Sequence, residues 1–138
     1  MKNLLVALGF LGLAFAGYMS ASKIVLGQCA FNETCPYFLG YPACFYGFAM
    51  YALITVLAVL LVSNAIRART AYKAIAGIAA AGIIFAGYFA LEELPTFFKL
   101  GFKAYMLGLP TCVLGLVFYV LIFCVALCCL VREHKKSS

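Results

Sequence analysis

The hydrophobic positions of this chain fall into four long apolar runs, and short connections between the runs carry most of the charged residues. Each run is close to the length of about 20 residues that a helix needs to cross a lipid bilayer. The runs cover residues 4–26, 41–63, 74–91 and 107–131. We therefore predict an all-α integral membrane protein, a bundle of four transmembrane helices that forms a single membrane domain over residues 1–138.

Composition supports this prediction, because 67% of the 138 residues are hydrophobic and only 10% are charged, against about 25% charged in a soluble domain. Four crossings leave no room for a soluble catalytic domain. The single histidine, His134, lies in a basic tail, and the chain has four carboxylates. A histidine-based triad or a His–carboxylate metal site inside the membrane is therefore not expected. Any chemistry must use cysteine, tyrosine or a bound cofactor.

Seven of the ten basic residues fall on one side of the predicted bundle, and three fall on the other. The seven are Lys2, Arg67, Arg69, Lys73, Arg132, Lys135 and Lys136. The positive-inside rule then places both termini in the cytoplasm and the first and third connections outside. The net charge of +6 is explained by this topology, so the expected partner is the lipid bilayer and not nucleic acid.

The chain also contains an internal match. The tetrapeptide at residues 15–18 recurs at residues 85–88, and residues 39–47 resemble residues 107–115. Three further positions, Tyr51, Leu53 and Ile54, match Tyr119, Leu121 and Ile122. The offsets of 70 and 68 residues agree closely, which predicts a duplicated two-helix hairpin with units at about 4–64 and 74–131. Because each unit crosses twice, the copies should be parallel repeats related by an axis along the membrane normal.

Seven cysteines are the main candidates for chemistry. Cys29 and Cys35 lie in the first outward connection, where an oxidising compartment preserves disulfides. Their pairing would be either a structural staple or a redox-active pair. Cys124, Cys128 and Cys129 lie toward the inner end of the fourth run and are expected to be small apolar fillers.

Gly40, Pro42, Gly47 and Tyr51 form a Gly-x-Pro-x4-Gly-x3-Tyr pattern that resembles vitamin K epoxide reductase homologues and the similar bacterial disulfide-bond oxidases. The order of the other features is similar too, from the cysteine-containing outward connection to a fourth helix that opens with Pro-x-Cys. The resemblance implies a four-helix bundle in which loop cysteines take electrons from a substrate thiol. Those electrons would pass to a membrane-embedded Cys-x-x-Cys pair beside a quinone.

This chain departs from that family in two places. The family's Cys-Pro-x-Cys is represented by residues 109–112, in which only Cys112, the position that abuts the quinone, is a cysteine. Cys35 stands only five residues before Gly40, so we expect the short helix that covers the quinone pocket in the family to be missing. The internal match makes Cys44 the counterpart of Cys112, and Cys44 would replace the missing cysteine if the two Cα atoms lie within about 7 Å. Alternatively, both cysteines are small residues that pack at helix starts.

The candidate redox residues are therefore Cys29, Cys35, Cys44 and Cys112. Hydroxyl groups that could assist quinone binding near Cys112 are those of Tyr88 and Tyr105. Residues 95–105 space phenylalanines and lysines four apart, which predicts a short interfacial helix. This segment would be either an ordinary aromatic belt or a flap over a quinone entrance.

Two functions remain in competition. The first is a membrane thiol–disulfide oxidoreductase that passes electrons between outward-facing cysteines and a quinone, with a thiol-containing protein as substrate. The second is a non-enzymatic small membrane subunit or scaffold, part of a larger membrane complex, that keeps the fold but has lost the redox dithiol. A small transporter is less favoured, because no run is broken at mid-membrane and no ionisable residue lies there. Whether the purified protein carries a quinone would distinguish the first two.

Overall fold

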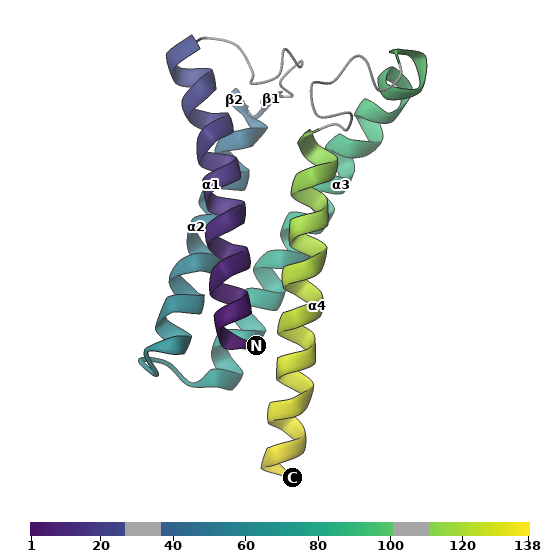
Figure 1. The fold of residues 1–138 in the computed structure, drawn as a ribbon. Helices are drawn as coiled ribbons and strands as arrows, with labels where there is room; N and C mark the ends of the chain where they lie inside the picture. The colour runs from purple at the N-terminus through teal and green to yellow at the C-terminus, as the bar shows by residue number, and fades with distance from the viewer. Residues whose placement is uncertain (27–36, 101–110) are drawn as a thin grey trace.

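The computed structural model describes residues 1–26, 37–100 and 111–138, and in these ranges it contains four long helices and a two-stranded hairpin (Figure 1). The elements are α1 (Lys2–Leu26), β1 (Tyr37–Phe38), β2 (Tyr41–Pro42), α2 (Ala43–Val62), α3 (Ala68–Leu100) and α4 (Thr111–Ser137). All four helices are long and apolar enough to cross a membrane. The predicted all-α, four-helix membrane architecture is therefore confirmed.

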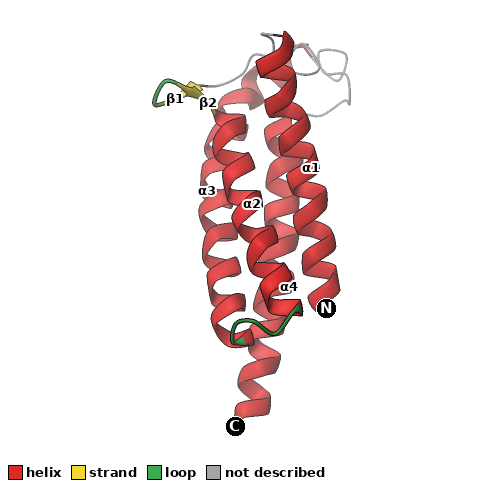
Figure 2. Ribbon diagram, turned by 90° about the vertical axis from the view of Figure 1, so that its left-hand side faces the viewer, coloured by secondary structure: helices red, strands yellow, loops and turns green. Residues whose placement is uncertain are grey.

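The helices run alternately up and down the bundle (Figures 1 and 2). α1 packs mainly on α2 and α3 packs mainly on α4, while α2 against α3 and α1 against α4 make the lesser contacts that join the two pairs. Both chain termini and the connection between α2 and α3 lie at one end, which we call the terminal end (Figure 1). The β1–β2 hairpin and the first turns of α2 and α4 lie at the other, which we call the hairpin end.

The hairpin fixes how the chain enters α2. Its strands pair antiparallel, with Tyr37 opposite Pro42 and Phe38 opposite Tyr41. The two turn residues both have positive φ, 52° at Leu39 and 86° at Gly40, as a two-residue type I′ turn requires. Glycine adopts this conformation without a steric penalty. Because β2 is followed directly by Ala43, this turn holds the start of α2 in place.

Two helices are longer than the apolar pattern predicted. α3 begins at Ala68 instead of residue 74 and ends at Leu100 instead of residue 91, and α4 continues to Ser137 instead of residue 131. A helix satisfies its own backbone hydrogen bonds, so it does not have to end where the apolar run ends. Residues 95–100 belong to α3 and not to a separate interfacial helix, although Pro95 interrupts the backbone bonding there. Residues 101–105 lie outside the described ranges.

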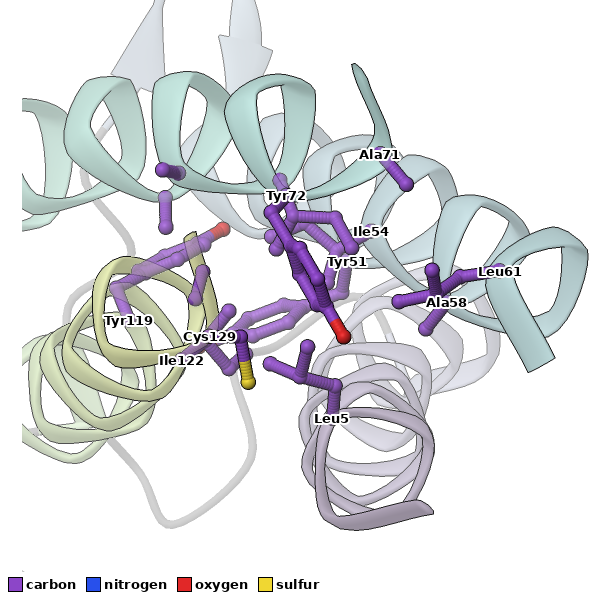
Figure 3. Close-up of a cluster of buried hydrophobic side chains, with 14 of the residues drawn as sticks. Leu5, Tyr51, Ile54, Ala58, Leu61, Ala71, Tyr72, Tyr119, Ile122 and Cys129 are labelled. Atoms are coloured by element: carbon purple, nitrogen blue, oxygen red, sulfur yellow. The ribbon is translucent and has the colours of Figure 1, made fainter. Parts of the chain in front are cut away.

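The core lies between the helices and consists mainly of small and branched apolar side chains around three tyrosines, Tyr51, Tyr72 and Tyr119 (Figure 3). The largest fully buried side chains are those of Leu5, Tyr51, Ile54, Leu61, Ile75 and Ile122. The outward faces, in contrast, expose large apolar side chains, which include Leu11, Ile24, Val56, Ile84, Leu91 and Val131. An apolar exterior of this extent is suited to contact with lipid and not with water.

Candidate functional site

The structure brings two of the four predicted redox positions to the same end of the bundle. Cys44 is the second residue of α2 and Cys112 is the second residue of α4, and both helices begin at the hairpin end (Figure 1). The side chain of Cys44 is half-buried. Cys29, Cys35 and Tyr105 lie outside the described residues.

Further along α2 and α4, two tyrosines connect these helices across the centre of the bundle. The rings of Tyr51 and Tyr119 stack with their centroids 4.4 Å apart and their planes 10° apart. The Tyr51 hydroxyl donates a hydrogen bond to the carbonyl oxygen of Gly115 at 2.9 Å. The Tyr119 hydroxyl donates one to the carbonyl oxygen of Gly47 at 3.3 Å. We call this arrangement the tyrosine pair.

Two glycines make room for the tyrosine pair. A Cβ atom at Gly12 of α1 would overlap the ring of Tyr51, and one at Gly82 of α3 would overlap the ring of Tyr119. The offset of 70 residues relates Gly12 to Gly82, and the offset of 68 residues relates Tyr51 to Tyr119, so the two glycine contacts are equivalent under the internal match. The offset of 68 residues relates the two hydrogen bonds to each other in the same way. These reciprocal contacts support the predicted parallel repeat, which stays a prediction for the units as a whole.

The contacts between α1 and α2 define a regular register. Gly9 faces Thr55, Gly12 faces Tyr51, and Gly17 faces Phe48. As α1 rises toward the hairpin end, its contacts therefore move back along α2 toward the first turn.

Ser20 is the polar side chain that sequence reasoning missed. It is only 7% exposed, and its hydroxyl oxygen is buried without a hydrogen-bond partner. The hydroxyl of Thr55 in α2, whose side chain is also buried, donates to the Tyr51 carbonyl oxygen at 2.7 Å. A serine within an apolar run gives no sign in the sequence that its hydroxyl is unsatisfied.

An aromatic group lies between α2 and α3 at the hairpin end. Tyr46 packs on Phe85 with 5.7 Å between ring centroids, and Phe85 packs edge-on against Phe89 at 5.0 Å. Tyr88, a predicted quinone-binding residue, is 59% exposed and lies one turn before Glu92 on α3. Phe89 links Tyr88 to the group, with 5.3 Å between their ring centroids.

The three cysteines near the end of α4 do not share one environment. Cys129 is buried in the core, as predicted for an apolar filler, and lies beside the Tyr72 hydroxyl. Cys124 and Cys128 are exposed on the outer face of the helix, so the prediction that they fill core space was wrong. Their spacing of four residues places them together on the lipid side of α4. Within residues 1–26, 37–100 and 111–138, no three His, Cys, Asp or Glu side chains gather to hold a metal ion.

The geometry thus assigns the chemically distinctive residues to the hairpin end, with the tyrosine pair deeper in the bundle. The glycine and tyrosine positions that match between the two halves are the ones that meet in space. Comparisons of the chain with protein-family models, with curated proteins and with solved structures found no match.

Proposed function

We propose that the protein is a membrane thiol–disulfide oxidoreductase whose redox-active pair is Cys44 with Cys112, and that this pair exchanges electrons with a quinone. The observation that carries the proposal is the position of each cysteine relative to the tyrosine pair. Tyr51 follows Cys44 by seven residues, and Tyr119 follows Cys112 by seven residues.

Seven residues of α-helix make about two turns, so a residue and its seventh neighbour lie on nearly the same face, about 10 Å apart along the axis. Position 44 therefore shares a face of α2 with Tyr51, and position 112 shares a face of α4 with Tyr119. Because the two rings stack at 4.4 Å, these faces are directed toward each other. Both cysteine positions then lie at the same depth, two turns nearer the hairpin end than the tyrosine pair.

In this proposal, Cys44 supplies the second cysteine that α4 lacks. With leucine at position 109, α4 offers one cysteine where the resembling family has two, and Cys44 restores a dithiol across the bundle axis. Oxidation of the dithiol releases two electrons and two protons, which a quinone accepts to become a quinol. Two thiols of a substrate protein would reduce the resulting disulfide again through a mixed disulfide. Cys29 and Cys35 are the proposed entry point for those electrons.

The residues at the hairpin end suit a quinone. Tyr46, Phe85 and Phe89 offer ring faces for stacking between α2 and α3. The exposed apolar surface of the bundle would accommodate a prenyl tail within the lipid. When bound, the quinone would supply the two-electron acceptor, and the chain's part is to hold the two cysteines within reach of it.

The direct test combines a disulfide map with an activity assay. Purified protein prepared without reductant should yield a peptide in which residues 44 and 112 are linked, and it should oxidise a dithiol substrate with ubiquinone or menaquinone. Cys44→Ser and Cys112→Ser should each lower that rate by at least about 100-fold, because neither can complete the disulfide. Cys124→Ser, an exposed cysteine on the far part of α4, is the matched control and should retain the rate. Full activity in Cys112→Ser would contradict the proposal.

A different observation favours the scaffold alternative. Both hydroxyls of the tyrosine pair are used in binding backbone carbonyl oxygens, so the centre of the bundle is built as a structural joint. In a scaffold, residues 44 and 112 would never be linked and no quinone would support thiol oxidation. The protein would then co-purify with a larger membrane complex.

A further inference from the structure

We propose that the outer face of α3 at the terminal end binds an anionic phospholipid, with Arg69 and Lys73 holding the phosphate of the headgroup and with an acyl chain lying over Gly77 and Ala81. This inference is independent of the redox chemistry proposed above. It assigns a lipid of defined charge to one place on the surface of the bundle.

The first step is the position of the two basic residues. α3 begins at Ala68, so Arg69 lies in its first turn and Lys73 in its second. Both side chains are exposed, whereas Tyr72 is buried toward the core. Within residues 1–26, 37–100 and 111–138, neither basic side chain forms an ion pair with a carboxylate. Because residues four apart are neighbours on one face of a helix, two cations stand side by side at the membrane surface.

This arrangement is electrostatically unfavourable for the chain alone. The start of a helix carries partial positive charge, which favours acidic groups and opposes basic ones, and the first turn of α3 contains no acidic residue. Like charges at a spacing of four residues also repel each other. A phosphate group between Arg69 and Lys73 relieves both effects, because its oxygens accept hydrogen bonds from the guanidinium and ammonium groups.

The basic residues at the end of α4 differ in this respect. Lys135 and Lys136 lie in the last turn of their helix, where the partial negative charge of the carbonyl groups favours cations. This pair carries the same charge as Arg69 and Lys73 and lies at the same end of the bundle (Figure 1). The need for an anion is therefore greater at the start of α3 than at the end of α4.

Below the two cations, the outer face of α3 is shallow. Gly77 and Ala81 are exposed, and in the described part of the chain nothing lies within 4 Å of a Cβ atom added at Gly77. The first large apolar side chain exposed along this helix is that of Ile84, at 75%. From Lys73 to Ile84 the helix rises about 16 Å, which is close to the half-thickness of about 15 Å of the hydrocarbon core. The shallow surface therefore has the length of an acyl chain in one leaflet.

The equivalent face of α1 has neither feature. The offset of 70 residues relates Ala81 to Leu11, whose side chain is 57% exposed and would fill the shallow surface. The same offset relates Lys73 to Asn3, which is uncharged. The two cations and the shallow surface thus occur together on α3 alone of these two related helices.

A second copy of the chain fits this face less well than a lipid does. Two copies in one membrane have the same orientation, so a two-fold contact through Gly77 and Ala81 would place Arg69 and Lys73 of both copies close together at the same depth. Repulsion among these four cations opposes that contact. An anionic phospholipid instead supplies opposite charge at that depth and an apolar chain below it.

The test uses the purified full-length protein in detergent and native mass spectrometry, which counts bound lipids and gives the oligomeric mass. The probes are dioleoyl-phosphatidylglycerol and dioleoyl-phosphatidylcholine, which share their acyl chains and differ in net charge. The wild-type protein should bind the first lipid at least about tenfold more tightly, because each basic residue at the membrane surface adds to the attraction of an anionic headgroup. Equal affinity for the two lipids would overturn the inference.

Two double variants separate the proposed site from the general positive charge of this end. Arg69→Gln with Lys73→Gln should reduce the preference to about twofold or less, whereas Lys135→Gln with Lys136→Gln should retain it. Arg69→Lys with Lys73→Arg, which keeps both charges, should retain it as well. A preference that survives the first variant, or that falls equally in the second, would overturn the inference.

Gly77→Leu tests the acyl-chain contact, and Ala7→Leu, at the equivalent exposed position of α1, is its matched control. Gly77→Leu should weaken phosphatidylglycerol binding by at least about threefold through the loss of close contacts, and the control should leave it unchanged. Helical circular dichroism should be the same in both, since a side chain added at position 77 meets no described residue.

Three results of this second comparison would overturn the inference. Unchanged binding by Gly77→Leu would show that no chain lies on this face. A change from dimer to monomer in that variant would assign the face to a second copy. Displacement of the lipid by inorganic phosphate would show a site for an anion alone.

Discussion

Gly12 and Gly82 leave the space that the two stacked tyrosine rings fill. Each ring lies directly over a glycine of the helix with which its own helix forms a hairpin, and each hydroxyl reaches the backbone of the opposite hairpin. Small residues allow helices to approach closely in lipid. Here they do more, because they let an aromatic side chain lie between the helices of one hairpin and contact the other hairpin.

We predict that Gly12→Ala and Gly82→Ala will each lower the free energy of unfolding by about 1–3 kcal/mol, the usual cost of overpacking a filled core. The control is Gly77→Ala on the exposed face of α3, where nothing lies within 4 Å of an added Cβ. That variant should be neutral, or more stable by up to about 1 kcal/mol, because alanine is the better helix former. Unfolding in sodium dodecyl sulfate titrations measures all three, and equal stability of Gly12→Ala and Gly77→Ala would contradict the packing argument.

The helix boundaries show what could be predicted from hydrophobicity and what could not. All four helices were predicted from run length, because the bilayer sets that length. The extensions of α3 to residues 68 and 100 could not be predicted from run length, because polar residues in water continue a helix as readily as they end one. The equivalence of Tyr51 and Tyr119 was visible as a sequence match, yet their contact depends on how the hairpins dock. The lack of a hydrogen-bond partner for the buried Ser20 hydroxyl depends on packing in the same way.

Pro95 offers a test at the scale of one helix. Its ring nitrogen cannot donate to the carbonyl oxygen of Leu91, so the last turns of α3 lack one backbone hydrogen bond. Pro95→Ala should restore it and slow amide hydrogen exchange in residues 96–100 by about tenfold, an effect that corresponds to about 1.4 kcal/mol. Leu91→Ala, which removes an exposed side chain and leaves the backbone bonding unchanged, should have little effect. Exchange that is equally fast with proline and alanine would show that these turns open independently of residue 95.

At the scale of the whole molecule, charge separates the two ends of the bundle. The terminal end carries exposed basic side chains, among them those of Arg67, Arg69, Lys73, Arg132, Lys135 and Lys136. The last turns of α4 extend beyond the other helices at this end (Figure 1). The side chain of Arg132 also contacts the sulfur of Met1 at 3.0 Å, which ties α4 to the start of the chain. This asymmetry is the basis for predicting that the terminal end faces the cytoplasm.

Labelling of intact cells with a membrane-impermeant maleimide would test that orientation. A cysteine placed at residue 41 in the exposed hairpin (Tyr41→Cys) should react from outside, and one placed at residue 137 (Ser137→Cys) should react only after the cells are opened. Peptide mass spectrometry identifies the labelled site among the natural cysteines. Labelling of residue 137 in intact cells would show the opposite orientation. The proposed thiol substrate would then lie in the cytoplasm.

The tyrosine pair has a consequence for the electrical integrity of the membrane. Four helices around a central axis are also the plan of a pore, and a polar line through such a bundle would let protons leak along it. Here the stacked rings occupy the axis, and their hydroxyls are bound to carbonyl oxygens of Gly115 and Gly47, so no chain of water can pass between them. In the proposed oxidoreductase, this closure would allow electron exchange at the hairpin end without a leak of protons through the bundle.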